Sequence, residues 1–535
     1  MKKLLILLTL LLTNIILAQQ QQYITWPSLA DSPWPIARGD AQATGRSKYV
    51  GPSTPNVIWR KDMPFGIIHG PVIGYNDDLF VGTRAFRGLT GDTVNYFYSL
   101  DKMGNNLWTF ITDGARPNVA GATIAIDGTI YFSSLGYSNL TGGGLYALNP
   151  NGTVKWQNEK FVYTYFTRFI PIGKDYNLYM PFIDTLYILE PVSGNTIYSI
   201  PTPNIADHDI VFSTNGDTIF YFTGRIFTTD SKKLNAVTVW GQHLWSVEFH
   251  WNTHNRGTPV VDNENRIYIF AEDTPSDKFL YCINPNGTIN WKYPLDSNEN
   301  YENYSSPTID SNGNIIFPSS IFVNSPVSDS GYITSLDYNG NLNWRTAFGH
   351  YWNDGAFINS GLVCDAEGKI YCGSSYGNNT NFWCLDNFGN VLWKLDLEGY
   401  EYDTSPAINS GGTLYIGTHL DLLFQDHKRN LIAINDTVTS VEINGSKISG
   451  YLPEQNYPNP FNSTTHIDFL LLERAKVTLT VFNTLGQEIK TLVNEELIPG
   501  YYSKIFDAKD LPSGVYFYVL TADNFVATKK LILLK

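Results

Sequence analysis

Residues 145–156 read "LYALNPNGTVKW", and this stretch contains the unit that decides the fold of the 535-residue chain. Two apolar stretches flank a turn that ends in Asn-Gly, which favours a hairpin between two paired strands. The same pattern returns in three further stretches, which are "LYCINPNGTINW" (280–291), "ITSLDYNGNLNW" (333–344) and "FWCLDNFGNVLW" (382–393). A hairpin that recurs at long intervals indicates an internal repeat.

Each unit closes with an aromatic residue, and these residues give the period of the repeat. The closing aromatics are Trp59, Trp108, Trp156, Tyr198, Trp245, Trp291, Trp344 and Trp393. The intervals between them lie between 42 and 53 residues, which is enough for four short strands with their loops, the content of one propeller blade. Helical periodicity, which a parallel α/β fold needs between its strands, is not apparent. The sequence therefore predicts an all-β fold, an eight-bladed β-propeller.

The two ends of the array predict how the ring closes. The last unit (404–436) has three strands but no closing aromatic, and the strand around Trp59 has no unit before it. We expect this N-terminal strand to complete the last blade, because closure removes the exposed edges of an open array.

The register of the repeat predicts where small side chains lie. Counting back from the hairpin, seven of eight equivalent residues are small, as closely packed sheets require; the eight are Ser99, Ala147, Ile188, Ala236, Cys282, Ser335, Cys384 and Ala433. We therefore interpret Cys282 and Cys384 as small core residues rather than reactive thiols. Cys364 and Cys372 fall on neighbouring strands of one blade, where a disulfide would form only if the geometry permits.

The N-terminus and the net charge bear on destination. Lys2 and Lys3 precede an apolar run and then Ala18, which predicts a signal peptide over residues 1–18. No later stretch is long and apolar enough for a transmembrane segment. The formal net charge of −14 argues against nucleic acid as a partner.

The units resemble the PQQ-like repeats of bacterial propellers. The stretch "WPIARGDAQATGRS" (34–47) is similar to the lead-in before such repeats. The resemblance covers about residues 34–436, within a propeller that we place at 19–436. Quinoprotein dehydrogenases of this fold carry adjacent cysteines and a calcium-ligand motif. Neither is matched here, so we expect no cofactor, neither PQQ nor calcium.

The C-terminal residues 452–535 resemble the type IX secretion sorting domain, and residues 437–451 are expected to form a linker. The matching stretches include "LPEQNYPNPFNSTTHIDFLL", "VTLTVFNTLGQEIKTLV" and "GVYFYVL". Their alternating strands, bounded by Pro and Gly, predict a small β-sandwich. The resemblance implies recognition by the type IX machinery, passage through the periplasm, and a surface-attached or released product.

Binding residues of propellers usually lie in loops at one face or around the central channel. The segments before each innermost strand also carry polar residues, among them His69 and Asp209. Two segments are richest in polar and aromatic groups, and they give as ligand-binding candidates Glu248, His250, Trp251, His254, Arg256, Trp352 and Asp354. Stacking aromatics with hydrogen-bonding groups suit a glycan or protein ligand. The same residues are also compatible with a metal or catalytic centre, or with loops that only cap strands and meet solvent.

Turns such as "DSNGN" (310–314) bear some likeness to calcium loops. They lack the full ligand set and the terminal acid of such a loop, and hairpin turn chemistry explains them better.

Three functions are therefore open at this stage. We expect a secreted, non-enzymatic binding protein whose propeller loops present a ligand-binding face. The alternatives are a secreted enzyme, either a quinone-dependent dehydrogenase or a carbohydrate-cleaving propeller, and a structural adhesin. Paired carboxylates in the central channel would favour the cleaving enzyme, and a flat apolar face would favour the adhesin.

Overall fold

The computed structural model separates the chain into two compact units, with the division after Asp436. The residues that it describes are 20–67, 69–84, 94–113, 121–134, 143–161, 169–202, 205, 209–223, 232–249, 257–274, 277–296, 299–300, 306–321, 330–350, 361–376, 379–399, 404–419, 428–436, 451–453, 456, 459–471, 475–497, 500–522 and 525–534. The signal peptide predicted over residues 1–18 and most of the predicted linker lie outside these ranges.

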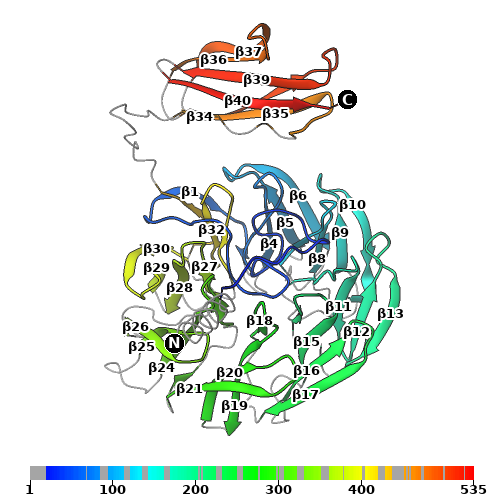
Figure 1. The fold of residues 1–535 in the computed structure, drawn as a ribbon, viewed down its shortest axis with the longest axis vertical. Coiled ribbons are helices and arrows are strands. Elements are labelled where there is room, and N and C mark those ends of the chain that lie inside the picture. Colours follow the sequence, from blue (N-terminus) through cyan, green and yellow to red (C-terminus); the bar gives the residue numbers. More distant parts are fainter. Residues whose placement is uncertain are drawn as a thin grey trace, which may run out of the picture. The chain divides into compact units, whose positions relative to one another are not determined.

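The described residues of the first unit form eight antiparallel sheets, which Figure 1 shows arrayed around a common centre. In chain order, the first three sheets are β3 (Val72–Ile73), β4 (Leu79–Arg84), β5 (Val94–Leu100) and β6 (Asn106–Asp113); β7 (Thr123–Ile124), β8 (Ile130–Ser134), β9 (Gly144–Leu148) and β10 (Val154–Asn158); and β11 (Leu178–Phe182), β12 (Thr185–Leu189) and β13 (Thr196–Pro201). The fourth to sixth sheets are β14 (Ile210–Phe212), β15 (Thr218–Thr223), β16 (Lys232–Thr238) and β17 (His243–Phe249); β18 (Val260–Val261), β19 (Ile267–Thr274), β20 (Asp277–Ile283) and β21 (Ile289–Pro294); and β23 (Thr308–Ile309), β24 (Ile315–Ile321), β25 (Ser330–Leu336) and β26 (Leu342–His350). The last two sheets are β27 (Val363–Cys364), β28 (Ile370–Tyr376), β29 (Asn379–Leu385) and β30 (Val391–Asp396); and β31 (Ala407–Ile408), β32 (Leu414–Gly417), β33 (Asn430–Ile434) and β1 (Val57–Asp62).

A few short elements accompany these sheets. β2 (Gly66–Ile67) pairs with β4, and β22 (Glu299–Asn300) pairs with β24. An isolated bridge between Ile172 and Leu178 precedes β11, and a 3-10 helix η1 spans Glu159–Phe161. The chain is thus all-β in its architecture, as the sequence predicted.

The predicted register is confirmed in every one of the eight sheets. Each closing aromatic lies opposite the residue that the repeat assigns to it, as the pairs Trp108 with Ser99 and Trp291 with Cys282 illustrate. The register shifts directly beside each closing aromatic, at a bulge that leaves one extra residue in the last strand of the sheet. A bulge bends its strand and redirects the next side chain, and here it accompanies the docking of each closing aromatic on the following sheet.

The closing aromatics join neighbouring sheets. Seven tryptophans donate an indole hydrogen bond, 2.7–3.3 Å long, to a backbone carbonyl of the next sheet, and Tyr198 donates its hydroxyl to Val239 in the same way. The turn that receives the ring needs glycine. A Cβ on Gly152, at φ +83°, would lie 2.6 Å from the Trp108 ring, so any larger residue would push the ring away.

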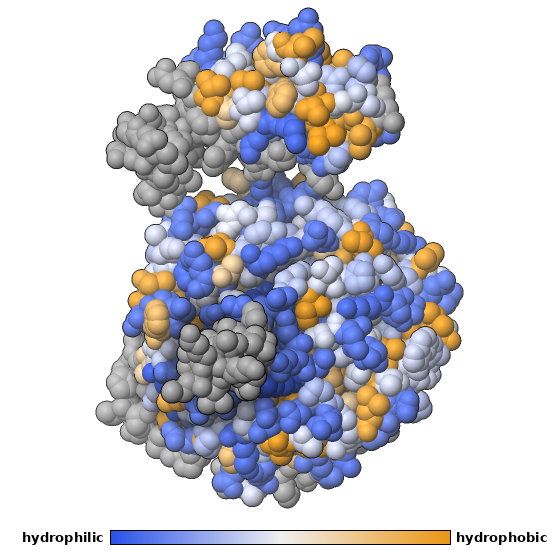
Figure 2. Space-filling model, in the orientation of Figure 1, coloured by the Kyte–Doolittle hydropathy of each residue, from blue (hydrophilic) through white to orange (hydrophobic). Residues whose placement is uncertain are grey.

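The extra residue of the bulge is exposed in several sheets. Leu107, Ile197, Leu244 and Leu392 are between 45 and 52 % exposed. On the face drawn in Figure 2, hydrophobic residues form separate spots among polar ones. Scattered apolar residues of this kind are ordinary on soluble proteins.

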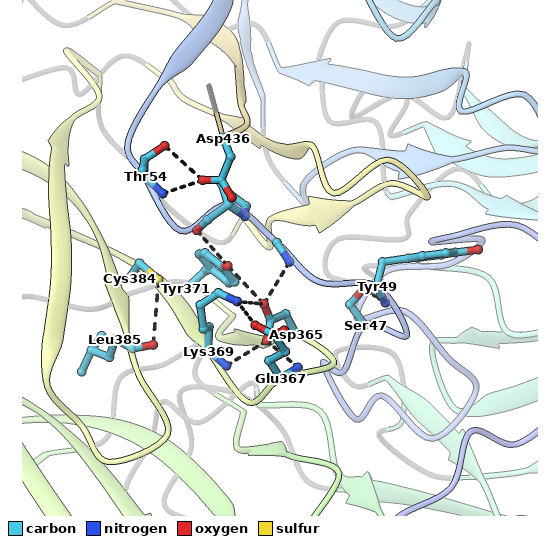
Figure 3. A network of polar contacts seen from close by, with 12 residues as sticks. Ser47, Tyr49, Thr54, Asp365, Glu367, Lys369, Tyr371, Cys384, Leu385 and Asp436 are labelled. Atoms are coloured by element: carbon cyan, nitrogen blue, oxygen red, sulfur yellow. Dashed lines mark hydrogen bonds and ion pairs between the residues drawn. The ribbon is translucent and has the colours of Figure 1, made fainter. Parts of the chain in front are cut away.

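The last sheet closes as predicted, because β1 pairs with β33. No hairpin joins these two strands, which come from distant parts of the chain, and polar contacts between residues 54–56 and 435–436 take the place of a turn. The backbone N–H and hydroxyl of Thr54 donate to Oδ1 of Asp436 at 2.7 and 3.0 Å. The N–H of Asn435 donates to the carbonyl of Asn56 at 3.0 Å. Figure 3 shows this junction beside Asp365 and Tyr371.

The second unit is a sandwich of two sheets with its own core. One sheet has the order β34 (Tyr451–Pro453), β35 (Thr464–Leu471), β38 (Gly500–Asp507), and the other has the order β37 (Glu488–Leu497), β36 (Ala475–Asn483), β39 (Gly514–Ala522), β40 (Phe525–Leu533). Buried residues alternate along β36 and β39, and Val477, Leu479 and Tyr518 belong to the core. The predicted β-sandwich is confirmed.

Candidate functional site

An N-terminal segment of residues 20–51, here called the axial segment, holds the innermost strands together. Figure 1 shows it in dark blue near the centre of the sheets. The carbonyls of Ala41, Gln42, Thr44 and Gly45 accept hydrogen bonds from four successive sheets, whose donors are the N–H groups of Phe212, Val261, Ile309 and Cys364. Further hydrogen bonds reach three more sheets, through Ile73, Ile124 and Ile172. The axial segment therefore crosses the axis where the innermost strands end.

Two backbone turns give the axial segment its shape. Arg38 and Ala43 adopt positive φ angles of 62° and 55°, beside Gly39 and Gly45 at 88° and 68°. A Cβ on Gly39 would lie 2.9 Å from the Trp34 ring, which is 1 % exposed. Gly39 and Gly45 of the motif "WPIARGDAQATG" therefore suit these turns, because glycine adopts positive φ angles without strain and has no Cβ to clash.

Asp40 organises the second turn of the axial segment. Its Oδ1 accepts the N–H of Gln42 at 3.2 Å and that of Thr44 at 2.9 Å, and its Oδ2 accepts the Thr44 hydroxyl. Burial raises the pKa of this carboxyl, while the hydrogen bonds from Thr44 and the nearby charge of Arg46 oppose the rise. The carboxyl therefore has a structural role, because both oxygens already serve the turn.

Two arginines link the axial segment to the sheets. Arg38 donates from Nε to the Ala43 carbonyl at 2.9 Å and from Nη2 to the carbonyl of Pro307 at 2.5 Å. Arg46 donates to the carbonyls of Asp310 and Gln22 at 3.2 and 3.0 Å, and burial lowers its pKa. Through these backbone carbonyls, Arg38 reaches the segment before β23 and Arg46 reaches the turn that follows it.

The opposite ends of the innermost strands carry a set of small and polar residues that we call the collar, which in the described part of the chain comes from six of the eight sheets and comprises His69, Asp209, Thr258, Ser306, Gly361, Thr404 and Ser405. Hydrogen bonds between its members join three pairs of neighbouring sheets. The Thr258 hydroxyl donates to Asp209 at 2.6 Å, and its N–H donates to the Ser306 hydroxyl at 2.8 Å. The N–H of Gly361 donates to the Thr404 carbonyl at 3.0 Å.

The collar is where the chain enters each innermost strand. Arg38 lies directly beneath it, because a Cβ on Gly361 would come within 2.1 Å of the Ser405 hydroxyl and 2.9 Å of the Arg38 guanidinium. The sequence analysis named His69 and Asp209 here but missed the serine and threonine members. A sequence pattern could have identified these members: a serine or threonine followed by proline stands just before three of the innermost strands, at residues 258–259, 306–307 and 405–406.

The structure describes one of the seven binding candidates. Glu248 lies on β17, the fourth strand of its sheet, and pairs with Lys233 at 3.3 Å while its side chain remains 55 % exposed. That position is on the outer strand and not in the collar. The other six candidates, His250, Trp251, His254, Arg256, Trp352 and Asp354, lie outside the described residues. In the sequence they belong to the two stretches that end directly before Gly257 and Gly361, so their place near the collar stays a prediction.

The turn at Asp310 has the hydrogen bonds of a hairpin turn. Its Oδ1 accepts the N–H groups of Asn312 and Asn314 at 2.9 and 2.8 Å, and its Oδ2 accepts the Asn314 amide at 2.7 Å. Burial raises the pKa of this carboxyl. The carboxylate is thus engaged by its own turn. No cluster of three or more metal-ligating side chains occurs among the residues that the structure describes.

All four cysteines are buried free thiols. Cys364 on β27 lies opposite Ile370, and Cys372 on β28 lies opposite Trp383, so the two are not paired across strands and no disulfide joins them. Cys282 and Cys384 are fully buried at the small position of the repeat. Burial raises the pKa of Cys282 to about 12, which keeps it a protonated core residue at neutral pH.

Comparison with known proteins gives one family match and several structural likenesses. Residues 455–534 match the family of the secretion system C-terminal sorting domain. Among solved structures, the Dos1 propeller has a TM-score of 0.49 at 10 % identity, covering 72 % of this chain and 97 % of its own. A fungal alcohol oxidase of the AA5 family, in complex with copper, has a TM-score of 0.39 at 9 % identity, covering 90 % of this chain and 100 % of its own. None of the curated proteins matches this chain.

The destination of the protein follows from its second unit. The family match covers nearly all of the sandwich that β34 to β40 build. No helix within the described ranges has the length and hydrophobicity to span a membrane. Residues 455–534 therefore form a secretion system C-terminal sorting domain, and the chain is a β-propeller protein that carries the type IX signal for secretion and association with the cell surface or outer membrane.

Proposed function

We propose that the exported propeller is a non-enzymatic binding protein, and that the loops around the collar present its ligand-binding face. The observation that supports this proposal is that the axial segment holds one end of the innermost strands, while the collar lies at the other end. The axial segment hydrogen-bonds to the innermost strands of seven sheets at one end, which fixes the strands whose other ends form the collar. A binding surface gains affinity when its base is rigid before the ligand arrives.

The chemistry around the collar suits a polar ligand. The collar residues Asp209 and Thr258 are buried and hydrogen-bonded to each other, so they form the polar base of this face rather than its contact groups. The adjoining stretches add Trp251 and Trp352, whose rings are suited to stack on a sugar or an aromatic side chain. A glycan or a protein segment therefore remains the ligand class that we favour for this face.

The test compares exported wild-type protein with variants of the two loop tryptophans. Trp251→Ala and Trp352→Ala, made in the full chain, are applied to an array of bacterial and host polysaccharides and to intact cells. We expect the wild type to bind at least one of these, and each substitution to weaken that binding at least tenfold. Phe388→Ala is the matched control, because Phe388 is an exposed aromatic, 72 % exposed, in the turn between β29 and β30.

Two results would contradict the proposal. The first is binding that both tryptophan variants retain while remaining folded. The second is a saturable rise in thermal stability with PQQ and calcium, because a ligand that binds only the folded state at a hundredfold excess over its Kd stabilises it by about 2.7 kcal/mol. The second result would favour the dehydrogenase.

A further inference from the structure

The joint between the third and fourth sheets differs from the other seven. Its closing aromatic is Tyr198 rather than a tryptophan, and the turn that receives it carries Trp240 next to Gly241. The Tyr198 hydroxyl still donates to the Val239 carbonyl, at 2.8 Å. The Trp240 ring stacks on the Tyr198 ring with centroids 6.0 Å apart and planes 24° apart.

The backbone around Trp240 is firmly held. The N–H of Thr238 donates to the Gln242 carbonyl at 2.8 Å, the N–H of Gly241 donates back to the Thr238 carbonyl at 2.8 Å, and the Thr238 hydroxyl accepts the N–H of Gln242 at 3.0 Å. A further bond joins the N–H of Val239 to the Asp217 carbonyl at 2.9 Å. The backbone that carries Trp240 is therefore held by its own turn, and the contact of the indole with Tyr198 orients the side chain.

The indole is presented rather than buried. Trp240 is 75 % exposed, the highest value among the exposed large hydrophobic residues of the described propeller. If Trp240 served only to fill the space that the smaller ring of Tyr198 leaves at this joint, contact with Tyr198 would be expected to bury more of the indole. One face packs on Tyr198, which leaves a flat aromatic surface for a ligand.

Exposed polar groups lie beside this surface. The bond between Val239 and Asp217 brings the turn of residues 213–218 alongside. Oδ1 of Asp217 accepts the Ser213 and Thr218 hydroxyls at 3.1 and 2.8 Å, and Oδ2 accepts the Asn215 amide at 2.7 Å. A carboxylate has about four lone-pair sites, so Oδ2 retains capacity to accept a further hydroxyl. Gln242 is also exposed.

From this geometry we propose that Trp240, with Asp217 and Gln242 beside it, is a binding platform for a neutral carbohydrate. A pyranose ring has an apolar C–H face of roughly the size of an indole and hydroxyls around its edge. The ring would stack on Trp240, and its hydroxyls would donate to Asp217 and exchange hydrogen bonds with Gln242. The carboxylate disfavours an anionic sugar at this position, because like charges repel. This platform is separate from the collar and does not depend on the function proposed there.

The experiment titrates the full mature chain with four neutral oligosaccharides, which are cellohexaose, xylohexaose, mannohexaose and chitohexaose, by isothermal titration calorimetry. We expect saturable binding of at least one of them. Trp240→Ala should weaken it at least tenfold, Trp240→Phe should retain part of the affinity, and Asp217→Asn should weaken it less than Trp240→Ala. Phe388→Ala is the control, because Phe388 precedes the turn glycine as Trp240 does and is 72 % exposed.

The outcomes separate this platform from the loop face. Loss of binding in Trp240→Ala, with retention in Phe388→Ala, Trp251→Ala and Trp352→Ala, supports the platform. Binding that Trp240→Ala leaves intact, or the absence of binding by all four oligosaccharides, overturns it. Trp240→Phe and Asp217→Asn keep the test decisive if Trp240→Ala does not fold.

Discussion

The last sheet and the seven sheets before it differ in how their last two strands are connected. In each of the seven, the last two strands are consecutive in the chain and a short turn joins them, as Asp386 to Asn390 join β29 to β30. In the last sheet, β33 and β1 come from opposite ends of the propeller, and Asp436 bonds Thr54 across the gap. The comparison teaches that closure relies on the same polar chemistry as a turn, without the covalent link.

The two kinds of connection share a carboxylate that holds backbone N–H groups. Oδ1 of Asp386 accepts the N–H groups of Phe388 and Asn390 at 2.9 and 2.8 Å. Oδ1 of Asp436 accepts the N–H of Thr54 at 2.7 Å. Loss of a bond inside a hairpin leaves the strands tethered, whereas loss of the same bond at the junction leaves them free to separate. Substitutions at the junction should therefore cost more.

The largest effect is expected from removing residues 20–62 of the mature chain. This deletion takes away β1 together with the axial segment, and hence the contacts to the innermost strands. We expect the thermal midpoint of the propeller to fall by more than about 15 °C, or the cooperative transition to disappear. Circular dichroism and size-exclusion chromatography measure both. Deletion of residues 437–535 is the control, and an unchanged midpoint after the N-terminal deletion would contradict the role of the axial segment.

The second effect concerns the indole that docks on the junction, compared with an indole at an ordinary joint. Trp393 is 6 % exposed and donates to the carbonyl of Pro52, which belongs to the N-terminal part of the chain. We expect Trp393→Ala to lower the free energy of unfolding by about 3–5 kcal/mol. Trp344→Ala, at a joint between two hairpin-connected sheets, should cost about 1–2 kcal/mol less. Denaturant titration tests this order, and equal losses would show that the junction has no special weakness.

A smaller effect is expected from the two carboxylates. Asp436→Ala should cost about 1–2 kcal/mol, because it removes two hydrogen bonds to a charged group at the junction. Asp386→Ala removes comparable bonds within a hairpin and should cost less, about 1 kcal/mol. The measurement is again denaturant unfolding. If Asp386→Ala proved the more damaging of the two, the covalent link would not be what distinguishes the sheets.

The smallest effect is a pH dependence of the folding stability that comes from Asp78. This residue lies in a turn of the first sheet, and the first sheet adjoins the last sheet. Burial, together with repulsion from Asp101 and Asp77, raises the pKa of Asp78 to about 6 from 3.8. A raised pKa favours the protonated form in the folded state, so this contribution is present below about pH 4 and is lost as the pH rises through about 6. Asp78→Asn should therefore stabilise the protein at pH 8, by no more than about 1 kcal/mol after solvent screening. Thermal unfolding at pH 8 and pH 3.5 tests this, and a gain of equal size at both pH values would refute it.

The repeat could be read from the sequence because each unit repeats the same local chemistry. An apolar stretch, a turn glycine and a closing aromatic recur, and Trp59 lies opposite Ala433 as the closure argument required. The sandwich was equally accessible, since alternation in "KVTLTVF" and "GVYFYVL" predicted its strands, whereas their pairing, with Val477 opposite Ala522, is known from the structure alone.

The axial segment could not be derived in the same way. It has neither alternation nor helical periodicity, and its hydrogen bonds run to residues far along the chain, as from Arg38 to Thr308. The collar was found in part, through His69 and Asp209. Of the binding candidates, Glu248 lies on an outer strand, and the other six remain predictions because they fall outside the described residues.

The bond between Thr54 and Asp436 spans 382 positions of sequence, and this separation sets an order of events. The segment that is synthesised first is the one whose partner is synthesised last. Contacts so distant along the chain form slowly, because a long loop must be ordered before they gain anything. The ring therefore stays open until residue 436 has been synthesised, and only then does the first-made end gain its final place.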